Sequence, residues 1–221
     1  SDIDHVGYYW KPWMGLIERG CYMIRHPVRA FGGGGREMGG QASAGAWFDM
    51  VSIKHKLAGE FGSDPAKIKL HYVEHHLAHA ASTFYVSDFD KSDIITIDAS
   101  GEWDTCLKMV GEGNDMKIVR RISNPHSLGC VYGGFTQYLG YLLSCDEGKV
   151  MGLSSYGEDA YRTFFEKLIR MEPDGTFKVD DSFFNMITMR QPMLYGNKIV
   201  REFGPPRGKK DPVKKFHEDI S

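Results

Sequence analysis

Hydrophobic residues in the first part of the chain follow two spacings, one typical of strands and one typical of helices. A short apolar run at residues 6–10 predicts a strand, which ends where a proline removes the next backbone donor. Apolar positions at helical intervals predict helices at 13–28 and 46–61. A second strand is predicted at 69–73, followed by a helix that continues to about Val86.

The pattern changes after Ser92. Three β segments are predicted at 94–97, 105–110 and 117–122, and the glycine-containing turns between them predict two consecutive hairpins. Hairpins that follow a helical region indicate that a second lobe begins near residue 92. The order of helices and strands as a whole predicts a mixed α/β fold.

Beyond the hairpins the pattern becomes helical again. A glycine-rich helix is predicted at 128–143, and because each glycine weakens a helix by about 0.5 to 1 kcal/mol, these glycines indicate close backbone packing or a nearby ligand. Residues 146–157 predict a loop and 161–171 a further helix, stopped by a Pro-Asp-Gly sequence. The chain after residue 177 is predicted to be less regular.

A run of four glycines lies within residues 31–36. It has neither the Gly-Lys-Ser/Thr ending of a phosphate-binding P-loop nor the spacing of a dinucleotide fingerprint. Glycine chiefly adds backbone freedom, so the run is interpreted as a mobile connector.

Composition excludes several classes of protein. The chain has 221 residues, 42% of them hydrophobic, and 27 Lys and Arg against 29 Asp and Glu give a net charge of −2, which argues against nucleic-acid binding driven by bulk charge. The four cysteines are far apart and form no CxxC pair, so reduced thiols and a cytoplasmic location are predicted. No apolar run is long enough for a membrane span, and no signal peptide is visible. A first residue of Ser, close to a strand, indicates a piece of a longer protein.

Three histidines fall within five residues at 75–79. On a helix, His75 and His79 lie on one face about a turn apart, whereas His76 points roughly 100° away. Two imidazoles at this spacing are suited to one metal ion. A third ligand is expected from Asp98, at the carboxyl end of an apolar strand. The alternative, given equal weight, is that these histidines cap a helix or hydrogen-bond in the core.

The turn after Asp98 carries a second chemical signal. It contains Ser100, Gly101 and Glu102, and such turns can direct backbone N–H groups and a hydroxyl at a phosphate. Taken alone, the turn favours the simpler interpretation, in which Asp98 and Ser100 satisfy the turn backbone.

Four blocks of sequence, in this order, resemble the nodulation-type and antibiotic-tailoring O-carbamoyltransferases. The blocks are Val73-Glu74-His75-His76-Leu77-Ala78-His79-Ala80-Ala81-Ser82, Ile97-Asp98-Ala99-Ser100-Gly101-Glu102-Trp103, Ser127-Leu128-Gly129 with Tyr132, Phe135, Thr136, Tyr138, Leu139 and Gly140, and Glu147-Gly148-Lys149-Val150-Met151-Gly152-Leu153 with Tyr156-Gly157. Ala99-Ser100 departs mildly from the usual glycine-containing pair. The last block is the most specific, because a generic α/β composition does not require it.

The resemblance implies a two-lobe architecture of the actin, sugar-kinase and Hsp70 type, which is ribonuclease H-like. Residues 1–91 would form the first lobe without its opening strands, and 92–221 the start of the second lobe. His75, His79 and Asp98 would hold a divalent metal, usually iron in these relatives, at the catalytic centre. Another aspartate ligand would lie beyond residue 221. The nucleotide side of the cleft would be formed by six residues, namely Ser100, Gly101, Glu102, Gly129, Lys149 and Gly152.

The resemblance also implies a two-step reaction. Carbamoyl phosphate and ATP would give carbamoyl-adenylate in a carboxyl-terminal YrdC-like domain, and the carbamoyl group would then pass to a hydroxyl of a small-molecule acceptor at the metal. Without that domain the 221-residue chain is expected to be inactive, and its open sheet edge is expected to recruit another chain, such as a second copy. Two alternatives stay open: another enzyme on the same lobes, either a threonylcarbamoyl-adenosine-type tRNA modification protein or a sugar-kinase-like ATPase, and a non-catalytic binding module.

Overall fold

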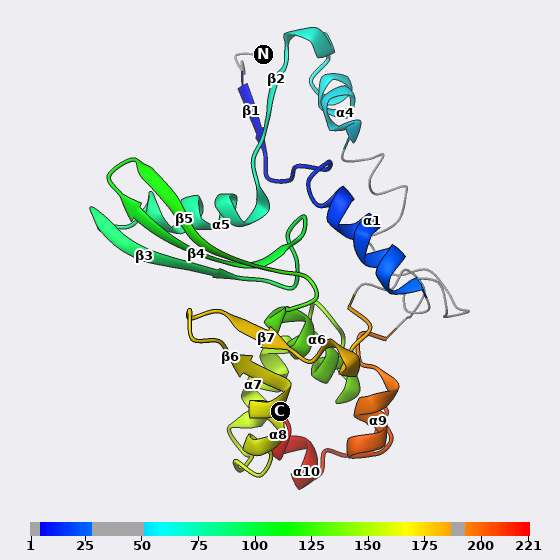
Figure 1. The fold of residues 1–221 in the computed structure, drawn as a ribbon. Coiled ribbons are helices and arrows are strands. Elements are labelled where there is room, and N and C mark those ends of the chain that lie inside the picture. The colour runs from blue at the N-terminus through cyan, green and yellow to red at the C-terminus, as the bar shows by residue number, and fades with distance from the viewer. Residues whose placement is uncertain (1–4, 28–50, 187–192) are drawn as a thin grey trace.

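The amino-terminal part of the chain forms a two-stranded parallel sheet (Figure 1). A computed structural model describes residues 5–27, 51–186 and 193–221. Strand β1 (His5–Tyr8) pairs with β2 (Lys69–Tyr72), and the register places His5 opposite Lys69. These strands confirm the ones predicted at 6–10 and 69–73.

Among the described residues between these strands, the chain forms two helices and a short 3₁₀ turn. They are α1 (Leu16–Arg25), α4 (Ile53–Glu60) and η1 (Pro65–Lys67). Both helices fall within the predicted ranges 13–28 and 46–61, and the parts of those ranges at 28–50 lie outside the described residues. The predicted connector at 31–36 also lies outside them.

An antiparallel sheet of three strands, covered by one helix, follows (Figure 1). Helix α5 (His75–Phe84) precedes β3 (Lys91–Ile97), β4 (Asp104–Glu112) and β5 (Asp115–Ser123), in the spatial order β3-β4-β5. Both predicted hairpins are therefore confirmed. The turn between β4 and β5 contains Gly113 at φ +58°, a conformation that glycine adopts without strain.

Helix α5 packs on this sheet through a small apolar core. The core consists of five buried residues, Ala80, Phe84, Ile94, Leu107 and Met109. Phe84 lies directly against Gly111, where an added Cβ would sit 2.6 Å from the ring. The helix before residue 92 and the sheet after it thus share one core, and the lobe boundary near that residue stays a prediction.

The rest of the chain forms helices around two further short strands, in the lower part of Figure 1. The elements in order are α6 (Leu128–Tyr138), α7 (Glu147–Ser154), α8 (Arg162–Leu168), β6 (Ile169–Met171), β7 (Phe177–Val179), η2 (Asp181–Phe183), α9 (Asn197–Phe203) and α10 (Lys215–Asp219). Helix α6 is shorter than the predicted 128–143, because Gly140 at φ +77° ends the helical path.

The predicted loop at 146–157 is wrong over most of its length, since Glu147–Ser154 form α7. Gly148 and Gly152 each weaken this helix locally. Val150 lies between them and is only 1% exposed in the core, so tertiary packing outweighs the local preference.

The predicted helix at 161–171 is wrong at its end. Helix α8 stops at Leu168, and Ile169–Met171 become β6, which pairs antiparallel with β7. The turn between them contains Gly175 at φ +78°, so the Pro-Asp-Gly sequence closes a hairpin rather than only stopping a helix. The region after residue 177 is correspondingly more regular than predicted.

A second, larger core holds these elements together. It contains thirteen buried residues, among them Phe135 and Tyr138 of α6, Leu168 of α8 and Ile199 of α9. Five of its members are aromatic, and partly buried rings pack against them, as Phe165 does against Phe135 at 5.2 Å between ring centroids. The mixture of helices and small sheets confirms the α/β class.

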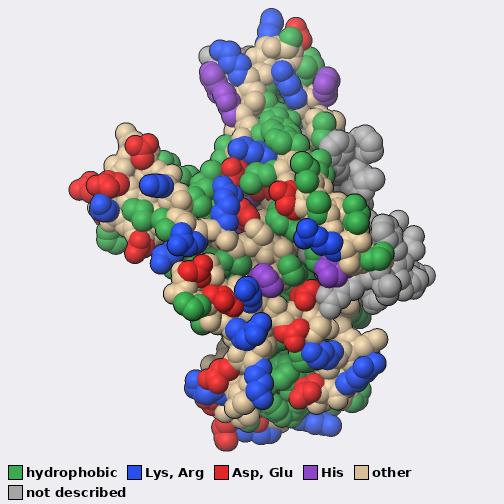
Figure 2. All heavy atoms as spheres, viewed as in Figure 1, with side chains coloured by type: hydrophobic (Ala, Val, Ile, Leu, Met, Phe, Trp, Pro, Cys, Tyr) green, Lys and Arg blue, Asp and Glu red, His purple; other side chains and the backbone are tan. Residues whose placement is uncertain are grey.

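The surface carries both signs of charge. On the face drawn in Figure 2, Lys and Arg side chains are interspersed with Asp and Glu. This distribution agrees with the net charge of −2. Within the described ranges, none of the helices combines the length and apolar character needed to cross a membrane.

Candidate metal centre

Two side chains from α5 and one from the residue that follows β3 meet at one point. The Nε2 atom of His75 lies 2.8 Å from Oδ2 of Asp98 and 3.0 Å from Nε2 of His79. The distance between Oδ2 of Asp98 and Nε2 of His79 is 3.3 Å. Across the described parts of the chain, these residues form the one group of three or more metal-ligand side chains that converge. The expected convergence of His75, His79 and Asp98 is therefore observed.

The backbone explains why these side chains meet. Helix α5 begins at His75, so His75 and His79 occupy successive turns of one face. Asp98 directly follows β3, and its amide donates to the carbonyl of Thr105 on the neighbouring strand at 3.0 Å. Because α5 packs across β3, the helix face with the histidines lies over the end of that strand.

The Asp98 carboxylate is held ionised by its neighbours. Its hydrogen bond to His75 lowers the pKa of Asp98 to about 2, and the amide of Ala99, which donates to Oδ1 at 2.6 Å, acts in the same direction. One oxygen is thus engaged by the backbone, while the other faces the two imidazoles.

The three atoms fit the ligand set of a single cation. Ligands bonded at roughly 2.1 Å to one tetrahedral or octahedral ion lie about 3.0 to 3.4 Å apart, close to the separations observed. A carboxylate oxygen and two unprotonated ring nitrogens are all acceptors, so this contact needs either a shared proton or a cation. The other ring nitrogen of His75, Nδ1, is buried and has no hydrogen-bond partner among the described residues.

The centre has a closed side and an open side. The side chain of His75 is 13% exposed, that of Asp98 35% and that of His79 52%. Solvent and ligands therefore reach the cluster from the side of His79.

His76 has a different role from its two neighbours. It is 2% exposed, and its Nδ1 lies 2.7 Å from the hydroxyl of Thr96 while Nε2 donates to the carbonyl of Asp104 at 3.0 Å. Burial lowers its pKa, which favours the neutral ring that this pairing requires. The alternative of a core histidine therefore holds for His76.

Two aromatic residues beside the centre were not predicted. The ring of Trp10 lies 5.1 Å from that of His75 between centroids, and the ring of Tyr9 lies 5.8 Å away and is 58% exposed. Sixty-five residues separate Trp10 from His75 in the chain, so no local pattern could have shown this contact.

The hairpin residues predicted to bind nucleotide make contacts within the protein. The hydroxyl of Ser100 donates to the carbonyl of Gly101 and accepts from the side chain of Asn124. Gly101 lies against the histidine helix, where an added Cβ would be 2.9 Å from the ring of His76. The carboxylate of Glu102 is buried and accepts hydrogen bonds from backbone amides, so it does not face solvent.

Gly129 lies close to the candidate metal centre through its backbone. A Cβ at this position would be 2.5 Å from the amide nitrogen of Ala99 and 2.6 Å from the carbonyl carbon of Asp98. Ser127 fixes the same contact, because its hydroxyl accepts from the amide of Cys130 and donates to the carbonyl of Ala99 at 2.7 Å. The first turn of α6 is thus docked on the chain segment that carries Asp98.

The other two predicted nucleotide residues lie on α7. Lys149 forms an exposed ion pair with Asp146 at 2.7 Å, and a Cβ at Gly152 would meet nothing within 4 Å. Figure 1 draws α7 in the lower part of the molecule, apart from α5. The structure does not bring these two residues to the histidine cluster.

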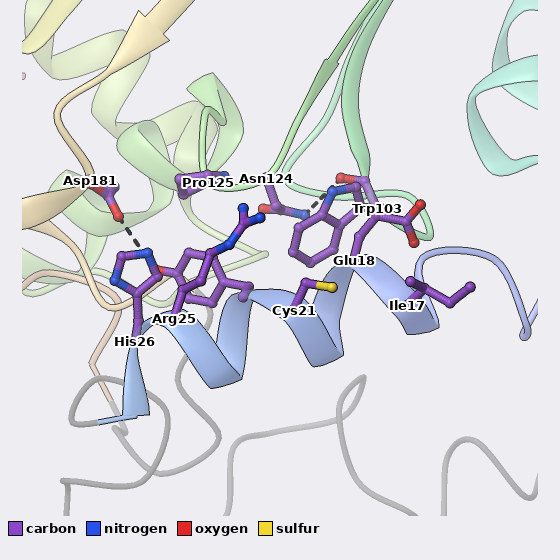
Figure 3. A pocket seen from close by; sticks show the side chains of 10 residues that line it. Ile17, Glu18, Cys21, Arg25, His26, Trp103, Asn124, Pro125 and Asp181 are labelled. Carbon is purple, nitrogen blue, oxygen red and sulfur yellow. Dashed lines mark hydrogen bonds between the residues drawn. The ribbon is translucent and has the colours of Figure 1, made fainter.

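A cavity of about 760 Å³ lies between α1 and the loops that follow β5 and β7 (Figure 3). Trp103 and Asn124 face α1 across it, and the amide of Asn124 donates to the carbonyl of Trp103 at 3.0 Å. Its lining also includes charged side chains of both signs, Glu18, Arg25 and Asp181. None of the predicted nucleotide-binding residues belongs to this lining.

Comparison with known proteins identifies relatives. The family described as "Carbamoyltransferase N-terminus" matches residues 51–220. An uncharacterized protein of Synechocystis sp. is 31% identical over 217 residues, which cover 94% of this chain and 34% of the relative. The nodulation protein NolNO of Sinorhizobium fredii is 39% identical over 128 residues, covering 58% of this chain and 19% of the relative.

The nodulation protein NolO of Bradyrhizobium diazoefficiens is 32% identical over 150 residues, covering 67% of this chain and 25% of the relative. The chain thus spans about a third or less of the length of these relatives. The family match covers most of the chain and includes the histidine helix, all three strands of the antiparallel sheet and α6 to α10. The chain therefore belongs to the carbamoyltransferase family, as a match to its amino-terminal region.

Proposed function

We propose that this chain supplies the metal centre of an ATP-dependent O-carbamoyltransferase with actin-like, ribonuclease H-like lobes. The observation that carries the proposal is the meeting of His75, His79 and Asp98, whose donor atoms lie 2.8 to 3.3 Å apart. Family membership supplies the reaction class. The divalent ion is proposed to be iron, from the resemblance described above.

The three residues would hold the ion while leaving positions open for substrate. An ion in this place would polarise the carbamoyl carbonyl or lower the pKa of the acceptor hydroxyl. The chain's own contribution is to keep Asp98 ionised, to keep His75 on the closed side and to leave the side of His79 open. A small-molecule hydroxyl acceptor would therefore approach past His79.

The second part of the proposal concerns the carbamoyl donor and its nucleotide. Carbamoyl-adenylate, made from ATP and carbamoyl phosphate in a YrdC-like domain, is proposed as the donor. Of the six residues expected near it, Ser100 and Gly101 lie on the same turn as Asp98, while Gly129 packs against the backbone of that turn. Lys149 and Gly152 lie on α7, away from this turn, so they would contact the nucleotide only if it extended from the turn to α7.

Metal binding is the direct test of the centre. The purified protein, stripped of metal and titrated anaerobically with Fe²⁺, is expected to bind one ion. His75→Ala and His79→Ala are expected to lose that binding, because two protein ligands hold an ion poorly. His55→Ala serves as the matched control, since His55 is an exposed histidine of α4. Equal binding by all four proteins would refute the proposed centre.

Turnover tests the rest of the proposal. The 221-residue chain and a longer protein that includes the YrdC-like domain would each be incubated with carbamoyl phosphate, ATP and a set of hydroxyl acceptors. Only the longer protein is expected to release AMP and a carbamoylated acceptor. Turnover by the 221-residue chain alone would place the adenylating site within it. Transfer to tRNA in place of a small molecule would favour the tRNA-modifying alternative.

A further inference from the structure

Glu102 is a buried carboxylate beside the metal centre that the proposed reaction does not use. The residue is 3% exposed. Its Oε1 atom accepts from the amide of Lys11 at 2.7 Å and from the amide of His75 at 3.1 Å, and Oε2 lies 3.2 Å from the same His75 amide. A buried charge is stable only when such donors surround it.

These two amides belong to the two segments that flank the proposed metal centre, the start of α5 and the segment that carries Trp10. The His75 amide is the first N–H of α5, and Lys11 directly follows Trp10, whose ring packs against that of His75. The backbone carbonyl of Glu102 also accepts from the guanidinium of Arg19 on α1 at 2.6 Å. One residue of the hairpin therefore binds three segments that are distant in sequence.

The cap of α5 comes from the hairpin rather than from the helix itself. Glu74, at the N-cap position, makes no side-chain cap, because its carboxylate pairs with Lys11 and Arg121. Glu102 takes its place at the positive end of the helix, where a carboxylate is favoured. Glu102 follows Asp98 by four residues on the same turn, so the cap links the first histidine ligand to the carboxylate ligand.

We propose that Glu102 is a positioning residue of the metal centre. Its carboxylate holds the start of α5 at a fixed place relative to the turn, and this sets the separation between the His75 imidazole and Asp98. The role rests on the proposed metal-binding function. It replaces the expectation that Glu102 faces a nucleotide phosphate, which a buried carboxylate would repel.

Cobalt binding can test this role without any turnover. Co²⁺ reports its ligand geometry in its visible absorption, so both affinity and coordination are read in one titration of the metal-free protein. Glu102→Gln keeps the size of the side chain but turns an N–H donor toward the His75 amide. Loss of a residue that orients a metal ligand weakens binding by about 10- to 100-fold, and we expect that range here together with a changed spectrum at saturation.

Two controls separate positioning from a general loss of stability. Glu112→Gln makes the same chemical change at the end of β4, where the side chain is 67% exposed. Tyr138→Phe removes a buried hydroxyl that donates to the carbonyls of Phe203 and Gly204 in the larger core. Both are expected to bind Co²⁺ within about twofold of the unmodified protein.

The outcomes are distinct. Absence of Co²⁺ binding by the unmodified protein would refute the metal centre itself. Normal binding by Glu102→Gln, or an equal loss in Tyr138→Phe, would refute the positioning role alone. If Glu102→Gln does not fold, Glu102→Asp decides: it keeps the charge but is one methylene too short for both amides, so binding weaker by about tenfold supports the role and unchanged binding refutes it.

Discussion

The two cores of the molecule are fixed in different ways. The core between α5 and the three-stranded sheet has only five buried apolar residues and depends on buried polar contacts, such as His76 with Thr96 and Glu102 with the His75 amide. The core around α6 to α10 has thirteen buried members, five of them aromatic, and further aromatic rings pack against it. Apolar packing is non-directional, whereas hydrogen bonds fix angles and distances, so the smaller core is suited to hold side chains for chemistry.

The largest expected effect is in the aromatic core. Phe135→Ala removes a ring that is 3% exposed and contacts three other phenylalanines, so we expect the free energy of unfolding to fall by about 3 to 5 kcal/mol. Urea denaturation measures this loss. Metal affinity, measured where the variant is still folded, should not change. A parallel loss of affinity would show that the two cores are not independent.

A matched truncation in the smaller core should affect both properties. Leu107 is fully buried on β4 under α5, and Leu107→Ala is expected to destabilise the protein by about 2 to 5 kcal/mol. Because the space left by Leu107→Ala lies beneath the histidine helix α5, metal affinity should fall as well. Retention of full affinity would mean that polar contacts alone hold α5 in place.

Two helix glycines are expected to respond in opposite directions. Gly129→Ala would press a methyl group against the backbone of Asp98 and Ala99, which cannot yield, and should destabilise the protein by about 1 to 3 kcal/mol and weaken metal binding. Gly152→Ala meets open space on α7 and should stabilise it by about 0.5 to 1 kcal/mol. Thermal unfolding of both variants gives the comparison. Loss of stability in Gly152→Ala would indicate an unseen contact at that position.

The smallest effect is a pH dependence in the aromatic region. Burial lowers the pKa of His217, whose Nδ1 accepts from the amide of Lys214, so the folded protein binds this proton less readily than the unfolded chain. The contribution to stability is complete above the unfolded pKa of about 6.5 and is lost as pH falls below it, with a slope of at most about 1.4 kcal/mol per pH unit. His217→Gln should flatten the unfolding free energy between pH 6.5 and 5. An unchanged slope would assign that pH dependence to other groups.

Local pattern was enough to predict that His75, His79 and Asp98 meet, but not the contacts that hold them in place. His75 and His79 are one helical turn apart, and Asp98 follows an apolar strand, so all three could be located from spacing alone. The Glu102 contacts could not, because its partners Lys11 and His75 are 91 and 27 residues away. Long-range pairing of this kind leaves no periodic signal in the sequence.

The difference between local pattern and long-range contact also explains which helices and strands were predicted correctly. The β3-β4-β5 hairpins were predicted because strand and turn residues are neighbours in the chain. Helix α7 was missed because Val150 is buried against residues far away, and β6 was missed because its partner β7 lies beyond a turn that was interpreted only as a helix stop. Tertiary contacts decided the structure where local preferences were weak.

The placement of the ligands along the chain also has a consequence for the order of folding. All three proposed ligands lie between residues 75 and 98, within a helix and hairpin whose contacts are between near neighbours. Such contacts form faster than those between distant segments. On the ribosome, β1 emerges before β2, the strand with which it pairs, and the Lys11 amide must wait for Glu102. Trp10 and Lys11 are thus synthesised early, but we expect them to reach their final positions last, after α5 and the turn that carries Asp98 have come together.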